Sequence, residues 1–219
     1  MVDYEVRGRV AVLTINRPDK KNAVNGDVAR GMEAALDRLE DDPEVWVGIL
    51  TGAGSVFCAG ADLKAINEGK AGELQTERGG FGGLVARSRT KPLIAAVDGP
   101  ALAGGTELVL ACDLVVASSA ATFGIPEVKR SLVAAAGGLF RLPRLLPRNI
   151  AVELGLTGDP ISAERAHHFG MVNVLCEPGG ALEAAMELAE RIAKNAPLAV
   201  RETLRLMREL AAADDDTGF

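Results

Sequence analysis

The sequence has few of the residues that most often carry acid–base, redox or metal chemistry. Its 219 residues include two histidines, three cysteines and one tryptophan. The histidines, His167 and His168, are adjacent, and adjacent residues of a helix do not share a face. They are typical of a polar helix end before Gly170. Acid–base chemistry near neutral pH is therefore expected from carboxylates with shifted pKa values.

The three cysteines are too scattered to build a site. Cys58, Cys112 and Cys176 form no C-x-x-C pair, which argues against a disulfide framework and a zinc site. We expect free, buried thiols, no metal and a reducing cytoplasm. The sequence also lacks a signal-peptide pattern and an apolar stretch long enough to span a membrane, so no membrane partner is expected.

Positive charge is in deficit. Lysine and arginine number 24 against 30 aspartates and glutamates, a formal net charge of −6. Nucleic-acid binding depends on neutralising phosphates, so we expect no nucleic-acid partner. The sequence contains no G-x-x-x-x-G-K-[ST], no G-x-G-x-x-G after a strand and no G-x-S-x-G. These absences argue against a P-loop, a dinucleotide fingerprint and a nucleophile elbow.

Apolar residues are plentiful, at 48% of the chain, and their spacing alternates between strand and helix periods. The pattern predicts an α/β protein. The predicted strands cover residues 10–16, 45–52, 91–99, 114–118, 122–127 and 171–176. The predicted helices cover residues 25–41, 104–113, 139–146, 149–156, 162–170, 181–194 and 197–210. Residues 65–83 are polar and glycine-rich, and are expected to be partly helical and mobile on the surface.

Three glycine-containing turns and two glutamates are the candidate functional residues. The turns at 58–64, 101–107 and 134–138 join strands to helices, where free backbone N–H groups can bind an anion. Glu107 and Glu127 each follow a turn and precede an apolar stretch. Desolvation raises a carboxyl pKa, and two nearby carboxylates push their pKa values apart, giving one acid and one base. On spacing alone, helix capping is the favoured interpretation of both glutamates.

Nearly the whole chain resembles the crotonase (enoyl-CoA hydratase/isomerase) superfamily, and most of all an enoyl-CoA hydratase. The similar blocks are "RVAVLTINRPDKKNAVN", "GILTGAGSVFCAGADLK", "KPLIAAVDGPALAGGTELVLACDLVVAS", "ATFGIPEVKRSLVAAAGGLFRLPRLLP" and "LTGDPISAERAHHFGMVNVL". The resemblance implies a crotonase/ClpP-like spiral of repeated ββα units with C-terminal helices. It divides the chain into a spiral core with the acyl-CoA site, residues 1–180, and a helical oligomerisation region, residues 181–219. That second region is expected to be truncated, and the assembly to be a homotrimer or a dimer of trimers.

The same resemblance implies roles for individual residues. The backbone N–H groups of Ala61 and Gly104 would form an oxyanion hole for a thioester enolate, and a Cβ at position 104 would obstruct the thioester. Glu107 would orient and deprotonate a water, and Glu127 would deliver a proton to the α-carbon. The implied reaction is syn addition of water to a trans-2-enoyl-CoA, giving a 3-hydroxyacyl-CoA in fatty-acid or related acyl-CoA metabolism.

Coenzyme A is implied as part of the substrate, with no separate cofactor. Its implied contacts are Ala61, Asp62, Leu63, Lys64 and Gly104, with Arg17 and Lys20 as weaker candidates.

The sequence departs from the family pattern at a few positions. Leu132–Gly138 replaces the "IPGAGG" of many hydratases. The stretch "GGLFRLPRLLP", residues 137–147, is similar to members that dehydrate carnitinyl-CoA. Ala103 stands where glycine is common, and Thr106 where cysteine is frequent. Alternatives therefore remain: carnitinyl-CoA dehydration, enoyl-CoA isomerisation, acyl-CoA hydrolysis, or acyl-CoA binding without turnover.

Overall fold

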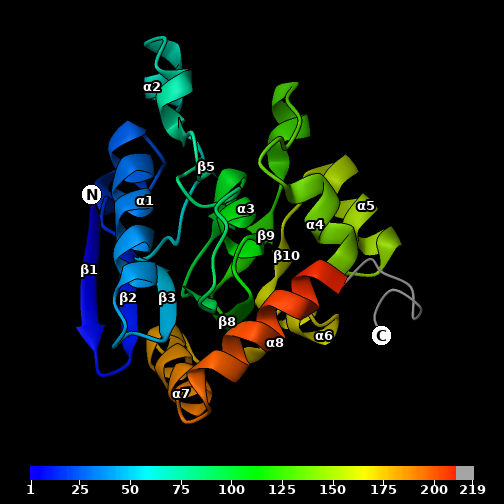
Figure 1. Cartoon of the computed structure of the whole chain (residues 1–219). Helices are drawn as coiled ribbons and strands as arrows, with labels where there is room; N and C mark the ends of the chain where they lie inside the picture. The colour runs from blue at the N-terminus through cyan, green and yellow to red at the C-terminus, as the bar shows by residue number, and fades with distance from the viewer. Residues whose placement is uncertain (211–219) are drawn as a thin grey trace.

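A six-stranded sheet forms the centre of the computed structural model, which describes residues 1–210 (Figure 1). Its spatial order is β1-β2-β3-β6-β8-β11. The first pair is antiparallel and every other neighbouring pair is parallel. The strands are β1 (Val2–Arg7), β2 (Val10–Ile15), β3 (Val47–Gly52), β6 (Leu93–Val97), β8 (Leu114–Ser118) and β11 (Val174–Cys176).

The helices alternate with these strands, which confirms the predicted α/β class. They are α1 (Gly26–Asp41), α2 (Leu63–Asn67), α3 (Gly104–Leu110), α4 (Gly138–Leu145), α5 (Arg148–Thr157), α6 (Ala163–His168), α7 (Ala181–Ala193) and α8 (Pro197–Leu210). Three short 3-10 turns, η1 (Pro18–Lys20), η2 (Ala71–Leu74) and η3 (Pro126–Arg130), complete the set. Within residues 1–210, no helix has both the length and the apolar character needed to cross a bilayer.

The edge strand β1 is an element that the sequence analysis did not predict. Val2 and Tyr4 are partly buried, while Asp3 and Glu5, which alternate with them, are exposed. The alternation is present in the sequence, but the strand has a single hydrogen-bonded neighbour and buries little. Its hydrophobic signal is correspondingly weak.

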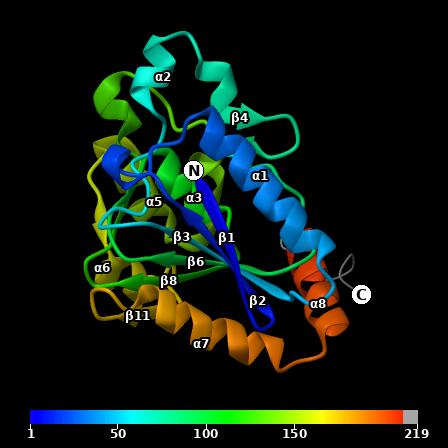
Figure 2. The same cartoon turned by 90° about the vertical axis from the view of Figure 1, so that its left-hand side faces the viewer.

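The two faces of the sheet pack against different helices (Figure 2). Ala11 and Leu13 of β2 join the hydrophobic cluster that includes α1, whereas Val10 and Val12 join the cluster that includes α7. This follows from the two-residue period of a strand, which sends successive side chains to opposite faces. Alternate residues of β2 therefore pack against α1 on one face of the sheet and against α7 on the other.

The two C-terminal helices attach to the body in different ways. Helix α7 shares a core with the sheet, burying Ala185 and Ala189. Helix α8 has no buried residue; its Arg208 donates to Asp113 Oδ1 at 2.5 Å. The oligomerising role expected of residues 181–219 stays a prediction, and residues 211–219 lie outside the described part of the chain.

The three cysteines carry no disulfide bond. Cys58 is buried, whereas Cys112 and Cys176 are partly buried. Burial raises the pKa of the Cys58 and Cys112 thiols to about 12, so neither is a thiolate near neutral pH. The free thiols match the prediction from the sequence.

A smaller sheet brings two parts of the site together. Its order is β10 (Ile161–Ser162), β9 (Thr122–Gly124), β7 (Ala101–Leu102), and β7 runs parallel to β9. Strand β7 leads almost directly into α3, which carries Glu107, and β9 leads into η3, which carries Glu127. Parallel strands end at the same edge of a sheet, so the two glutamates emerge side by side.

Thr106 links α3 to the strands of this small sheet by hydrogen bonds. Its Oγ1 accepts from the Gly124 N–H at 2.9 Å and lies 2.6 Å from the Ala101 carbonyl oxygen, to which it can donate. The hydroxyl therefore links the first turn of α3 to both β7 and β9. A buried hydroxyl with these partners is fully satisfied.

Replacing Lys91 with methionine is expected to destabilise the fold by about 2 kcal/mol, because it leaves a buried acceptor without a donor. Lys91 is 1% exposed, and its Nζ donates to the Leu39 carbonyl at 2.5 Å and the Asp42 carbonyl at 2.6 Å. These oxygens lie at the C-terminus of α1. Chemical denaturation measures the change. Lys194→Met, at an exposed lysine, is the control, and an equal effect of both variants would contradict this role.

Candidate active site

Glu107 is a buried carboxylate held by the backbone of a distant turn. It lies in the first turn of α3 and is 3% exposed. Its Oε1 accepts from the N–H groups of Ala136 at 2.7 Å and Gly138 at 2.9 Å. Burial raises the pKa of Glu107, while the two N–H donors and the nearby Arg141 charge oppose that rise. The glycine turn 134–138 is thus an anion site, and its anion is this protein's own carboxylate.

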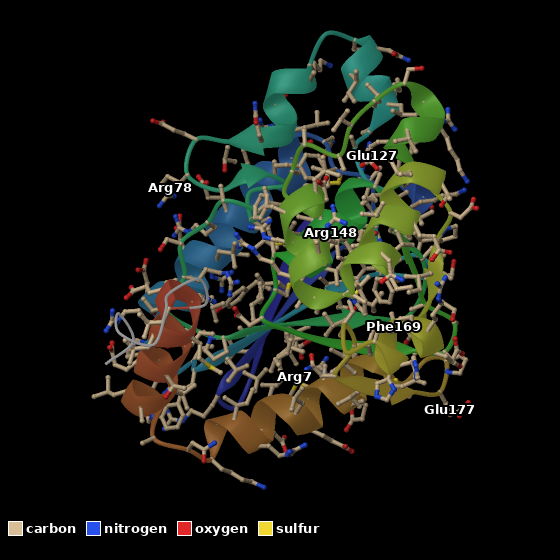
Figure 3. The ribbon with its side chains drawn as sticks, turned by 90° about the vertical axis from the view of Figure 1, so that its right-hand side faces the viewer. Arg7, Arg78, Glu127, Arg148, Phe169 and Glu177 are labelled. Carbon is tan, nitrogen blue, oxygen red and sulfur yellow. The ribbon has the colours of Figure 1, made fainter. Side chains whose placement is uncertain are left out.

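Glu127 lies in a contrasting environment. It follows Pro126 in η3 and is half-buried, on the far side of the sheet from α7 (Figure 3). Its Oε2 is buried and has no hydrogen-bond partner within residues 1–210. Burial is the main cause of its raised pKa, and the charge of Glu107 raises that pKa further.

The two environments favour different protonation states for Glu107 and Glu127. Glu107 has two N–H donors and a cation that favour its ionised form. Glu127 has an unpartnered oxygen and a neighbouring negative charge that favour its protonated form. The site can therefore present a base and an acid at the same pH.

Two free backbone N–H groups lie near this pair. Val24 N donates to the Gly60 carbonyl and Asp62 N donates to the Val24 carbonyl, both at 2.8 Å, so the N–H of Ala61 between them points away from Val24. Gly104 begins α3. Neither the Ala61 nor the Gly104 N–H donates to another group in the described range, 1–210.

The loops that carry these N–H groups are in contact. A Cβ built on Gly60, whose φ is +91°, would lie 3.1 Å from the Gly104 nitrogen. A Cβ on Gly105 would collide with the Cys58 carbonyl. Glycine at these positions therefore permits the close approach that places both N–H groups on one side of the site.

Phe81 lines the site, and the sequence analysis did not predict it. A Cβ on Gly104 would collide with the Phe81 ring, so the first obstacle to a side chain at position 104 is a neighbouring residue and not the substrate. Phe81 lies in the hairpin β4 (Gln75–Thr76) and β5 (Gly80–Phe81). The prediction that residues 65–83 lie on the surface is wrong for this part, since Leu74 is 5% exposed and Phe81 is half-buried.

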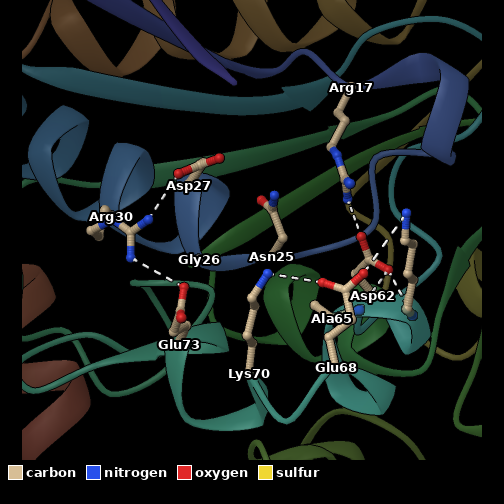
Figure 4. A pocket seen from close by; sticks show the side chains of 11 residues that line it. Arg17, Asn25, Gly26, Asp27, Arg30, Asp62, Ala65, Glu68, Lys70 and Glu73 are labelled. Atoms are coloured by element: carbon tan, nitrogen blue, oxygen red, sulfur yellow. Dashed lines mark hydrogen bonds and ion pairs between the residues drawn. The ribbon is translucent and has the colours of Figure 1, made fainter.

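The residues expected to contact coenzyme A gather at the start of α2. Asp62 Oδ1 accepts from the Lys64 N–H at 2.9 Å, and its Oδ2 lies 2.7 Å from Arg17 Nη1. Arg17, Asp62 and Lys64 line an open pocket of about 230 Å³ together with Lys70 (Figure 4). The Lys64 side chain is 81% exposed.

The remaining candidates do not line this pocket. Leu63 is exposed, and Lys20 and Leu63 are not among the residues that line this pocket. Ala61 and Gly104, the predicted oxyanion donors, do not line it either. The role of each of these residues in binding coenzyme A stays a prediction.

Replacing Ala103 with glycine is expected to stabilise the protein by about 1 kcal/mol. Ala103 has φ 53° and ψ −128°, a conformation that favours glycine and costs other residues about 1–3 kcal/mol. The greater freedom of glycine in the unfolded chain offsets about 0.5–1 kcal/mol of that gain. Thermal unfolding should show a midpoint about 3 °C higher.

Ala111→Gly is the matched control at the other end of α3. Ala111 has φ −84° and ψ −12°, which an alanine adopts without strain. This variant is expected to lower the unfolding midpoint. A midpoint for Ala103→Gly at or below that of wild type would show that the backbone at Ala103 is not strained.

Comparisons with known proteins identify the family of the chain. The family model for "Enoyl-CoA hydratase/isomerase" matches residues 5–217. The chain is 42% identical to the enoyl-CoA hydratase EchA19 of Mycobacterium tuberculosis, over 98% of this chain and 83% of that protein. It is 39% identical to the carnitinyl-CoA dehydratase of Proteus mirabilis, over 97% and 82%. A crystal structure of an enoyl-CoA hydratase from Mycobacterium tuberculosis superposes with a TM-score of 0.96 at 56% identity, covering 100% of this chain and 85% of that one.

Proposed function

The chain belongs to the enoyl-CoA hydratase/isomerase family and has its fold, and from that premise we propose that it is a hydratase adding water syn to a trans-2-enoyl-CoA. The family assignment and the crotonase-type fold confirm the predictions from the sequence. The observation that carries the proposal is the asymmetric carboxyl pair. Glu107 has two backbone donors, whereas Glu127 has a buried oxygen without a partner within residues 1–210.

In the proposed mechanism, the thioester carbonyl oxygen accepts hydrogen bonds from the N–H groups of Ala61 and Gly104. Negative charge develops on that oxygen as the enolate forms, and each such donor contributes about 3–4 kcal/mol of transition-state stabilisation. Neither N–H is engaged by another group within the described residues, so both are free to donate.

The two glutamates then divide the proton transfers. Glu107 takes a proton from a water molecule as the water oxygen bonds to the β-carbon, and the π electrons move toward the thioester. Glu127 gives its proton to the α-carbon, which completes the new C–H bond. Water thus adds as H and OH, and the carboxyls return to their starting states by exchanging protons with solvent. Dehydration follows the same chemical steps in reverse.

Further features of the proposal follow from the family and the sequence. Coenzyme A enters as part of the substrate, extending past Ala61 toward Lys64, and the reaction needs no resident cofactor. The proposed assembly is a homotrimer or a dimer of trimers. The three free cysteines favour a cytoplasmic location.

Carnitinyl-CoA dehydration is the second candidate. The Proteus mirabilis relative carries that name, and a carnitinyl-CoA dehydratase structure from Mycobacterium avium is 50% identical, with a TM-score of 0.92. The same acid–base pair serves both reactions, because dehydration reverses hydration. The two differ in the substituent next to the hydroxyl-bearing carbon, where carnitinyl-CoA carries a quaternary ammonium group.

Mass spectrometry of products from a panel of acyl-CoA thioesters tests the proposal. The panel holds straight-chain trans-2-enoyl-CoA esters and carnitinyl-CoA. We expect the enoyl esters to gain the mass of one water. Water loss from carnitinyl-CoA alone would favour the second candidate. A double bond shifted without a mass change, located by NMR of the product, would indicate isomerisation. Release of free coenzyme A would indicate hydrolysis, and binding without any product would contradict catalysis.

A further inference from the structure

Arg141 joins two loops on opposite walls of the site. It lies in the first turns of α4 and is half-buried. Its Nη2 donates to the Val85 carbonyl at 2.6 Å, and its Nη1 donates to the Ala136 carbonyl at 3.3 Å. Two carbonyl acceptors on the planar guanidinium fork fix the orientation of this side chain.

The first loop is the one that holds Glu107. Ala136 donates its N–H to Glu107 Oε1 and accepts from Arg141 through its carbonyl. A Cβ on Gly137, whose φ is +110°, would collide with the Arg141 guanidinium, so that group packs directly on the turn. Loss of the Arg141 side chain therefore removes the hydrogen bond to the carbonyl of Ala136, the residue whose N–H orients Glu107.

The second loop is the one that carries Phe81. The N–H of Val85 donates to the Phe81 carbonyl at 3.4 Å, and the Phe81 ring lies against Gly104. Through the Val85 carbonyl, Arg141 therefore reaches the wall beside the predicted oxyanion hole. One side chain bridges the carboxylate side and the oxyanion side of the site.

We propose that Arg141 is a positioning residue for the hydration reaction: it clamps the 134–138 turn to the 81–85 segment and so fixes the Glu107 carboxylate relative to the Gly104 N–H. The inference rests on the proposed function for its kinetic consequence. The coupling of Arg141 to Glu107 is a property of the protein alone and does not depend on a substrate.

The charges around Arg141 support an electrostatic part of this role. Burial lowers the pKa of Arg141, the charge of Glu107 opposes that change, and the cations Arg89 and Arg144 reinforce it. Cys112 also faces Arg141, and its raised pKa keeps it neutral. Around Glu107, the charged neighbours are Arg141 and the second carboxyl, Glu127. Removing Arg141 therefore removes the cation that opposes protonation of Glu107.

The test compares Arg141→Met, Arg141→Lys and Arg144→Met in the full chain. Arg144 lies one turn along α4, is exposed and carries the same charge, which makes its variant a matched control. A nearby opposite charge shifts a carboxyl pKa by about 1–3 units, so Arg141→Met should move the acid limb of kcat/KM up by about one pH unit. At pH values on the acid limb, below the wild-type pKa of Glu107, we expect kcat/KM to fall about tenfold with a smaller change in KM, as one unit of pKa implies. Arg141→Lys should keep the acid limb of kcat/KM near its wild-type pH, and Arg144→Met should leave that limb unchanged.

A substrate-free measurement separates this inference from the proposed function. The Glu107 carboxyl carbon is titrated by ¹³C NMR in wild type and in Arg141→Met, with Glu107→Gln identifying the signal. An upward shift of the Glu107 pKa supports the coupling even if no enoyl-CoA is hydrated. An unchanged pKa together with an unchanged pH profile overturns it, whatever happens to the unfolding temperature.

Discussion

Replacing Glu127 with glutamine is expected to lower kcat for crotonyl-CoA hydration by about 10²–10⁴-fold, the usual contribution of a general acid. Glutamine has nearly the same shape but has no acidic proton to give to the α-carbon. KM should change little, since the oxyanion donors and the coenzyme A contacts are untouched. Loss of the absorbance of the conjugated enoyl thioester measures the rate.

Glu153→Gln provides the matched control for the Glu127 variant. Glu153 is exposed on α5, where its Oε2 pairs with Arg165 at 2.7 Å. This variant should hydrate crotonyl-CoA at the wild-type rate. A Glu127→Gln variant that keeps more than about a tenth of wild-type kcat would remove Glu127 from the role of acid.

Replacing Glu107 with glutamine is the second large effect, with an expected loss of about 10²–10⁴-fold in kcat. The glutamine oxygen can still accept from the Ala136 and Gly138 N–H groups, so the turn keeps its anchor. The amide cannot take a proton from water. In contrast, Glu107→Ala leaves two buried donors unsatisfied and should also destabilise the fold by about 1–3 kcal/mol.

The pH profile distinguishes the roles of the two glutamates. Glu107 must be ionised, so kcat/KM falls as the pH drops through its pKa, which burial raises. Glu127 must be protonated, so kcat/KM falls as the pH rises through its pKa, which burial and the Glu107 charge raise. The active range therefore lies above the ordinary carboxyl pKa near 4.3. If the residual activity of Glu107→Gln keeps the wild-type acid limb, that limb belongs to another group.

Local elements of the fold could be predicted because their signals are local. Asn25 caps α1 by accepting from the Val28 N–H at 3.0 Å, and Ser162 caps α6 by accepting from the Arg165 N–H at 3.2 Å. Gly170, with φ +87°, ends the turn after α6 as predicted. These features depend on residues within a few positions, which a sequence displays directly.

The partners within the site could not be predicted, because they come from segments far apart in the chain. Glycine turns indicated an anion site at 134–138, but nothing in the sequence shows that its anion is Glu107. The parallel pairing of β7 with β9, which aligns the two glutamates, joins strands of two and three residues. Such short strands carry no usable periodicity.

Phe81 and Arg141 illustrate the same limit on individual side chains. Phe81 lies in a polar, glycine-rich stretch, so its contact with Gly104 depends on a hairpin that packs only in the folded chain. Arg141 is one of two arginines in α4, and its two acceptors, the Val85 and Ala136 carbonyls, are backbone atoms. Backbone acceptors leave no trace in a sequence.

The most direct test of the central claim is hydration of crotonyl-CoA in D₂O by the wild-type protein, with the product configuration read by NMR. Glu107 and Glu127 emerge at the same edge of the small sheet, so the hydroxyl and the new α-proton should come from one face. We predict 3-hydroxybutyryl-CoA with one deuterium at the α-carbon, syn to the β-hydroxyl. Deuterium on the opposite face or on both faces, or no hydrated product, would contradict the two-carboxylate account.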